Sequence, residues 1–230
     1  MPVHLLTTGT DGSPDPVPLL TAEGFLLDMD GTLVDSTAVV HAVWGLFAQQ
    51  HGLTDRLGEI LTFSAGRPGI DTIRHFLPDV SEQDRREIQV ALIAEEIART
   101  DGNAEVPGAR AFVTALLDDR VPVALVTSAT EPLMRVRMEA AGVPVPGTVV
   151  CAEDVERGKP APEGYLRAAG MLGLAPGCCV VFEDASSGYE AARAAGAQVV
   201  VVGDGVPEAD ADAVRVADLR GLTVRPVSQP

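Results

Sequence analysis

Two aspartates, Asp28 and Asp30, follow a short apolar run that begins at Phe25, within the segment DMDGTLVDS. Residues two apart in an extended backbone point to the same face, so both carboxylates can converge on one site while Met29 points away. Carboxylates at a strand end can bind a hard cation, act as a nucleophile or transfer a proton. An isolated D-x-D usually only caps a helix, but the apolar strand before this one and the Gly-Thr turn after it favour the chemical interpretation.

Thr127 and Ser128 end a second apolar run, ALVTSAT. A hydroxyl at the end of a strand is commonly no more than a helix cap. The same hydroxyls and their backbone N–H groups can also donate hydrogen bonds to phosphate oxygens. Both interpretations stay open for this pair when it is taken alone.

Lys159 lies in the segment ERGKPAPEGY, between Gly158 and Pro160. Most lysines are solvated surface residues, and that is the simplest interpretation of this one too. However, Pro160 and Pro162 restrict the backbone, and Pro162 suits an early helical position. The pattern therefore predicts a cation held by a rigid loop at the start of a helix, which suits a phosphate group.

Glu183 and Asp184 follow the apolar run CVVF and precede ASSG. They could simply favour the start of the next helix through its dipole. Alternatively they complete an all-oxygen site for Mg²⁺, which typically takes one or two carboxylates together with water and phosphate oxygens. No Cys/His cluster has the spacing of a zinc site, and we interpret His41, His51 and His75 as surface or helical residues.

Strand and helix patterns alternate around these four segments. Because the strands are apolar throughout rather than alternating, they predict an α/β fold with a parallel sheet covered on both faces. The four segments then all fall at strand ends on the same side of the sheet, where open α/β sheets bind ligands. The predicted elements are strands in 25–28, VPVALVTS, GTVVCA, CVVFED and QVVVV, and helices at 109–118, 131–141, 161–170 and 187–195.

Residues between the first and second of these units show helical patterns and no convincing strand. One of them, SEQDRREIQVALIAEEIART, has a possible N-cap at Ser81, as Ser36 is for the helix after DMDGTLVDS. We therefore predict a helical cap inserted into the core. The expected division is a flexible N-terminal extension over 1–22, a core of 23–42 and 108–230, and a cap of 43–107.

Composition narrows the classes of protein further. The formal net charge of −16 repels nucleic acid phosphates and anionic lipid, and no run of 18 apolar residues suggests a membrane span. With three cysteines, two of them adjacent, a disulfide framework is implausible and a reducing cytoplasm is expected. A phosphorylated substrate would also be repelled at long range, so an anion site must be built locally from a metal ion, basic side chains and backbone N–H groups.

The order of the four segments resembles the haloacid dehalogenase superfamily, whose pattern is D-x-D-G-T, then Thr or Ser, then Lys, then an acidic pair. The resemblance covers about residues 24–222 and implies a Rossmann-like core. The helical insert is similar to the cap of the subgroup that includes small sugar phosphatases, glycerol phosphate phosphatases and β-phosphoglucomutase. The stretches that resemble sugar and polyol phosphatases are GRPGIDTIRHF, AEDVERGKPAPEGYL and VVFEDASSGYEAARAAG.

This resemblance implies a role for each site residue in the hydrolysis of a small phosphorylated sugar or polyol. Asp28 would be the nucleophile that forms an aspartyl-phosphate, and Asp30 the acid and then the base. The phosphoryl group would be bound by Thr127, Ser128 and Lys159. Mg²⁺ would be held by Asp28, the Asp30 carbonyl and Asp184, with Glu183 touching the ion or supporting its ligands.

The part of the substrate beyond the phosphate is expected to meet the cap. Arg67, in SAGRPG, would face the site and read the substrate, although a surface arginine explains the residue equally simply. We expect a monomer, with a small phosphorylated metabolite as its partner.

Three rivals remain. A signalling receiver domain also phosphorylates an aspartate, but it would be shorter, uninterrupted, and phosphorylated on a middle strand. A dehalogenase would not need Asp30 or the metal-binding acids. A phosphoglucomutase shares all four segments, but it carries a His ten residues after the acid/base Asp. Here that position is Val40, and His41 is rotated by about 100° on a helix, so we expect its side chain to point elsewhere.

Overall fold

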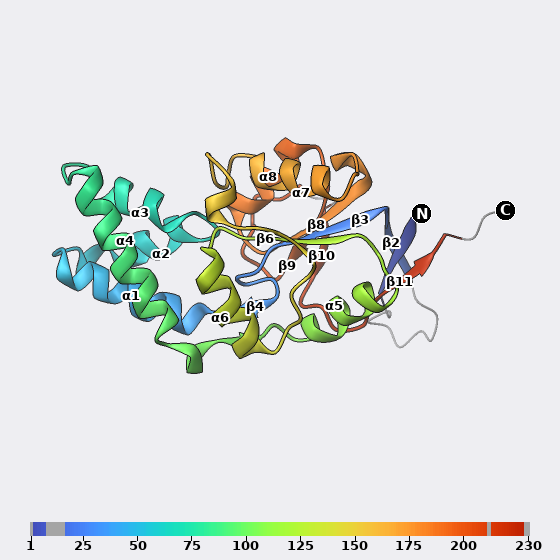
Figure 1. The fold of residues 1–230 in the computed structure, drawn as a ribbon, viewed down its shortest axis with the longest axis horizontal. Helices are drawn as coiled ribbons and strands as arrows, with labels where there is room; N and C mark the ends of the chain where they lie inside the picture. Colours follow the sequence, from blue (N-terminus) through green and yellow to red (C-terminus); the bar gives the residue numbers. More distant parts are fainter. Residues whose placement is uncertain (1, 8–16, 211–212, 228–230) are drawn as a thin grey trace.

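A six-stranded parallel sheet forms the centre of the computed structural model, which describes residues 2–7, 17–210 and 213–227 (Figure 1). Its strand order is β10-β9-β8-β3-β6-β7, and every neighbouring pair is parallel. The strands are β3 (Gly24–Leu27), β6 (Val123–Val126), β7 (Thr148–Val150), β8 (Cys179–Glu183), β9 (Gln198–Val202) and β10 (Val214–Val216).

Helices cover both faces of this sheet (Figure 1). On one face lie α5 (Ala109–Asp118) and α6 (Glu131–Ala141), and on the other α7 (Glu163–Met171) and α8 (Ser186–Ala195). Strands β3, β6 and β8 are buried along their whole length, as strands between two helical layers must be. The predicted α/β fold is confirmed, and the predicted bounds of 109–118 and 131–141 are those of the structure.

The central strand β3 joins the two halves of the core. Phe25 and Leu27 belong to the cluster under α5 and α6, whereas Leu26 belongs to the cluster under α7 and α8. Phe25 meets Phe112 of α5 edge to face, with ring centroids 6.0 Å apart. The segment DMDGT therefore begins from a strand that is fixed on both sides.

Four helices form a cap with its own hydrophobic cluster. They are α1 (Thr37–Gln50), α2 (Leu57–Ser64), α3 (Gly69–Phe76) and α4 (Glu82–Ile97). The predicted cap of α4 is confirmed, because the Ser81 hydroxyl accepts a hydrogen bond from the Asp84 N–H. Short 3₁₀ turns η1 (Thr54–Arg56), η2 (Thr100–Gly102), η3 (Ala152–Asp154) and η4 (Pro176–Cys178) complete the helical elements of the described ranges.

The chain crosses between core and cap through two short strands, β4 (Val34–Asp35) and β5 (Ala104–Glu105), which pair antiparallel. The sequence predicted no strand in the region of β5. The predicted boundary after residue 42 also falls inside α1, because Val39 and Val43 lie on one stripe of this helix and pack in the cap cluster. We therefore place the first crossing at β4.

The N-terminal segment corrects the expectation of a flexible extension over 1–22. Strands β1 (Val3–Thr7) and β2 (Val17–Ala22) pair antiparallel, and β11 (Leu222–Pro226) adds to the other edge of β1. Leu5 is fully buried against the core, which gives this segment a reason to be ordered. The prediction for 8–16 lies outside the described residues.

Among the residues that the structure describes, no helix is both long and apolar enough to cross a bilayer.

The small sheet makes a testable contribution to stability. We expect Leu5→Ala to lower the free energy of unfolding by about 2–5 kcal/mol, the usual cost of truncating a fully buried leucine. Val17→Ala on the neighbouring strand β2, where the side chain is 50% exposed, should cost less than about 1 kcal/mol. Urea denaturation measures both values. Equal, small losses would show that β1 is not part of the core.

Candidate active site

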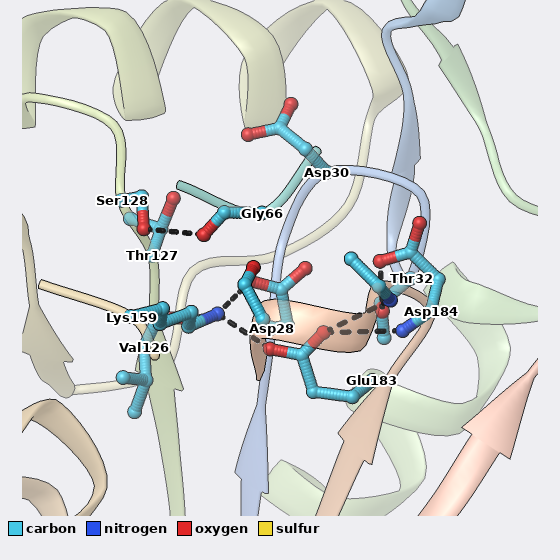
Figure 2. Close-up of polar contacts among 12 residues, drawn as sticks. Asp28, Asp30, Thr32, Gly66, Val126, Thr127, Ser128, Lys159, Glu183 and Asp184 are labelled. Atoms are coloured by element: carbon cyan, nitrogen blue, oxygen red, sulfur yellow. Dashed lines mark hydrogen bonds and ion pairs between the residues drawn. The ribbon is translucent and has the colours of Figure 1, made fainter. Parts of the chain in front are cut away.

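The four segments singled out in the sequence meet at the carboxyl ends of β3, β6 and β8 (Figure 2). Asp28 follows β3 directly and Thr127 follows β6. Glu183 is the last residue of β8, and Asp184 comes next. Parallel strands bring their carboxyl ends to one edge, so residues far apart in the chain become neighbours there.

Lys159 is the cation at the centre of this edge. It is 6% exposed, and its ammonium group donates hydrogen bonds to Asp28 Oδ1 and, at 2.6 Å, to Glu183 Oε1 (Figure 2). A third contact runs to the carbonyl oxygen of Val126, at 3.3 Å. The sequence predicted a displayed cation, and the structure holds it inside the protein between two carboxylates.

Negative charge exceeds positive charge in this cluster. Carboxylate oxygens of Asp28, Glu183 and Asp184 lie within 4.8 Å of one another, and Lys159 forms ion pairs with the first two of them. Burial raises the pKa of Asp28 and of Asp184, and the neighbouring carboxylates raise both further. Burial lowers the pKa of Lys159, but the carboxylates of Asp28 and Glu183 outweigh it and the net pKa is raised.

Glu183 is fully enclosed and its oxygens are already in use. Oε1 accepts hydrogen bonds from Lys159 and, at 2.5 Å, from the Tyr165 hydroxyl, while Oε2 accepts from the backbone N–H of Asp184 at 3.2 Å. A side chain at Gly188 would place its Cβ 1.7 Å from Glu183 Oε1, so only glycine lets α8 approach so closely. This arrangement suits a residue that orients Lys159 rather than one that offers free lone pairs.

Asp184 and Asp28 are the carboxylates best placed to hold a cation. The Thr32 hydroxyl donates to Asp184 Oδ1 at 3.4 Å, and Gly31 has a φ of +80° and passes so close that a Cβ there would lie 1.9 Å from Asp184 Oδ2. The group is all oxygen, without a nitrogen or sulfur ligand. Oxygen ligands with excess negative charge fit a hard cation such as Mg²⁺.

Asp28 and Asp30 border one cavity, but the extended geometry predicted for this pair stops before Asp30. Its carboxylate points away from Asp28 (Figure 2), and Oδ1 accepts hydrogen bonds from the Ser36 hydroxyl at 2.6 Å and from Arg137 Nη1 at 2.8 Å. The reason is that β3 ends at Leu27 and a turn follows, so the alternation of an extended strand does not reach Asp30. Ser36 sits at the N-cap position of α1, but its hydroxyl bonds Asp30 instead of capping the helix.

The sequence missed two charged residues beside Asp30. Arg137 is 4% exposed, and its Nη2 donates to Glu96 Oε1 of cap helix α4 at 3.0 Å. Burial raises the pKa of Glu96, and Arg137 opposes this shift. The sequence did contain a pattern that could have identified Arg137. It lies on the same buried stripe of α6 as Met134 and Met138, where a charged residue needs a buried partner.

A cavity of about 250 Å³ separates the core from the cap and is lined by Asp28, Asp30 and Asp184. Arg67, predicted to read the substrate, lines it as well, and its guanidinium lies over the Phe63 ring at 4.9 Å. Val40 and His41 both line the cavity. His41 is exposed at this border, and the expected direction of its side chain stays a prediction.

Thr127 and Ser128 lie at the same edge but already have partners. Thr127 Oγ1 accepts from the Ala129 N–H at 3.0 Å, and Ser128 Oγ donates to the Gly66 carbonyl of the cap at 2.9 Å (Figure 2). Ser187 Oγ makes a similar bond to the Ala65 carbonyl, also at 2.9 Å. The cap loop is thus tied to the core immediately above the site.

Comparison with known proteins places this geometry in a family. The family model described as haloacid dehalogenase-like hydrolase matches residues 22–196. Hexitol phosphatase A of Escherichia coli is 43% identical over 183 residues, which cover 80% of this chain and 84% of that protein. Glycerol-1-phosphate phosphohydrolase 2 of Saccharomyces cerevisiae is 31% identical, over 79% of this chain and 74% of that protein.

A solved structure, that of a hydrolase from Pseudomonas syringae, has the same fold. It superposes with a TM-score of 0.76 at 21% identity and covers 87% of this chain and 95% of that one. The fold, the family match and the identity to the curated relatives agree with the resemblance inferred from the four segments. The chain belongs to the haloacid dehalogenase-like hydrolase family.

Proposed function

We propose that this chain is a Mg²⁺-dependent phosphatase that hydrolyses a small phosphorylated sugar or polyol through an aspartyl-phosphate on Asp28. It is a phosphoric monoester hydrolase, the activity named for its curated relatives. The observation that carries the proposal is the buried Asp28 carboxylate, held by Lys159 at the floor of a cavity beside Asp184. A nucleophile, a fixed cation and a cluster of oxygen ligands are the parts that phosphoryl transfer requires.

In the first step Asp28 attacks phosphorus, and the bond between phosphorus and the ester oxygen breaks. Lys159 holds Oδ1, which leaves Oδ2 to attack. The departing alkoxide takes a proton from Asp30. Attacking and leaving oxygens lie roughly in line across the phosphorus, so an acid on the far side from Asp28 is what this geometry needs. The orientation of Asp30 away from Asp28 agrees with that requirement.

In the second step water attacks the phosphorus of the aspartyl-phosphate. Asp30, which lost its proton in the first step, accepts one from this water, and the bond between phosphorus and Asp28 breaks. Inorganic phosphate leaves and both carboxylates return to their starting forms. One residue thus serves as acid and then as base, a role worth about 10²- to 10⁴-fold in rate.

We assign the Mg²⁺ ligands to the Asp28 and Asp184 carboxylates and the Asp30 carbonyl, with Glu183 supporting the site through Lys159. When bound, the ion supplies positive charge that offsets the repulsion between Asp28 and the phosphoryl oxygens. We assign phosphoryl binding to Thr127, Ser128 and Lys159. For Ser128 this means that its hydroxyl exchanges the Gly66 carbonyl for a phosphate oxygen.

The rest of the substrate would occupy the cavity under the cap, where Arg67 reads it. Hexitol and glycerol phosphates, the substrate types in the names of the relatives, are small enough for a cavity of about 250 Å³. We further propose that the protein is a monomer. The three cysteines are free, which suits the cytoplasm.

A phosphoglucomutase-type activity is the second candidate, because His41 lines the cavity beside Val40. Such an enzyme passes the phosphoryl group from Asp28 to a sugar hydroxyl instead of water. We favour the hydrolase, because the position ten residues after Asp30 is the aliphatic Val40.

The test is a panel of sugar and polyol monophosphates assayed for free phosphate with and without Mg²⁺. A parallel reaction contains β-glucose 1-phosphate and a trace of glucose 1,6-bisphosphate. We expect Mg²⁺-dependent release of phosphate from several polyol and sugar phosphates. Efficient formation of glucose 6-phosphate with little free phosphate would overturn the hydrolase assignment.

Replacing the nucleophile tests the covalent step. Asp28→Asn should lower kcat by far more than about 100-fold, because it removes the attacking carboxylate at nearly constant size. Asp55→Asn, on the cap surface, is the control and should keep full activity. Phosphate release and circular dichroism measure turnover and fold. A folded Asp28→Asn protein with more than about a hundredth of wild-type kcat would rule out this nucleophile.

Replacing Asp184 tests the cation site without relying on activity. Mg²⁺ should raise the Tm of the wild type, because it binds the folded cluster and relieves repulsion between its carboxylates. Asp184→Asn should raise Tm in the absence of Mg²⁺, since one buried carboxylate is gone, and should abolish the Mg²⁺-dependent rise. The exposed Asp204→Asn should behave as wild type. An unchanged Mg²⁺ response in Asp184→Asn would exclude Asp184 as a ligand.

A further inference from the structure

We propose that Arg137 is the positioning residue for Asp30, and that Glu96 of the cap fixes Arg137 in turn. The inference rests on the proposed function, in which Asp30 transfers the proton to and from the reacting oxygen. Three segments meet at this point: the turn after β3, core helix α6 and cap helix α4. The guanidinium of Arg137 is the group that contacts both carboxylates.

The two donors on Asp30 share one oxygen. Ser36 Oγ at 2.6 Å and Arg137 Nη1 at 2.8 Å both bond Oδ1, so the torsion angles of this side chain are fixed from two directions. In the described ranges no group donates to Oδ2. This second oxygen is therefore the one left to exchange a proton with the ester oxygen, and Asp30 borders the cavity in which that oxygen must lie.

The chemistry of arginine suits this task. A guanidinium has a planar set of five N–H donors and can hold two carboxylates at fixed angles, which a lysine ammonium group cannot do. Here Arg137 Nη1 donates a hydrogen bond to Asp30, and Nη2 donates one to Glu96. A cation that is 4% exposed is costly to bury, and two carboxylate partners offset that cost.

Glu96 brings the cap into the arrangement. It lies near the end of α4, whose Ile93 and Ile97 pack against the core cluster, and its contact with Arg137 adds an ion pair between cap and core. The position of Asp30 thus depends on the cap being in place. A proton donor that is aligned only under the cap would act when the substrate is enclosed, where bulk water does not compete.

The experiment compares two substrates that differ in their need for an acid. The alkoxide of glycerol 1-phosphate must be protonated as it leaves, whereas p-nitrophenolate leaves without a proton. Arg137→Gln should lower kcat for glycerol 1-phosphate by about 10- to 100-fold, part of what general acid–base catalysis contributes. The pre-steady-state burst of p-nitrophenol from p-nitrophenyl phosphate should change by less than about threefold, because Asp28 and Lys159 are untouched.

Matched controls come from neighbouring residues of the same type. Arg135, on the exposed side of α6, pairs with Glu131, and Arg135→Gln should leave both rates unchanged. Glu96→Gln keeps an acceptor for Arg137 and should lower kcat for glycerol 1-phosphate less than Arg137→Gln does. Glu95→Gln, which loses only a surface pair with Arg99, should have no effect.

Arg137→Lys keeps the positive charge but loses the planar guanidinium that bonds two carboxylates. The ratio of its rate with glycerol 1-phosphate to its burst rate with p-nitrophenyl phosphate should lie between the ratios of the wild type and Arg137→Gln. If Arg137→Gln does not fold, Arg137→Lys tests the proposal instead, and a ratio equal to that of the wild type would overturn it. Equal losses with both substrates would also overturn it, since they would mark a purely structural role. Absence of phosphate release by the wild type would instead refute the proposed function itself.

Discussion

The contact of Lys159 with Asp28 and Glu183 is the constraint on which the rest of the site depends. Three carboxylates lie within 4.8 Å of one another in a buried place, where like charges repel strongly. One lysine, itself 6% exposed, offsets part of that repulsion. Burying such groups is expensive, so the fold must hold them rigidly. It does so by fixing β3 and β8 between two helical layers and by fitting Tyr165 and Gly188 around Glu183.

Where local pattern decides structure, the sequence was a good guide. Helices α5 and α6 begin and end at the predicted residues, because apolar periodicity is strong and Gly108 and Gly142 take left-handed φ values at their limits. The uninterrupted apolar strands indicated a parallel sheet, and a parallel sheet brings its carboxyl ends together. That single consequence was enough to gather Asp28, Thr127 and Glu183.

Contacts between distant segments were the part that the sequence could not predict. Strand β1 pairs with β11, whose residues are more than 200 positions away along the chain. No local sequence pattern predicts a partner at that distance. Strand β5 is only two residues long and exists because it pairs with β4. Asp30 accepts a hydrogen bond from Arg137, 107 residues further along the chain, so a strand rule applied to DMD alone could not predict the direction of its carboxylate.

The separation of Asp28 and Asp30 also bears on how one site can serve hydrolysis or phosphoryl transfer. In the proposed mechanism the first step is the same for both, and the choice is made when the phosphorus of the aspartyl-phosphate meets its acceptor. That acceptor must occupy the side of the cavity toward Asp30, opposite Asp28. Residues of the cap, among them Val40, His41 and Arg67, line this space, whereas the core contributes Asp28, Ser128 and Asp184. In this proposal the cap selects the acceptor, because the core segments are common to the phosphatase and the mutase.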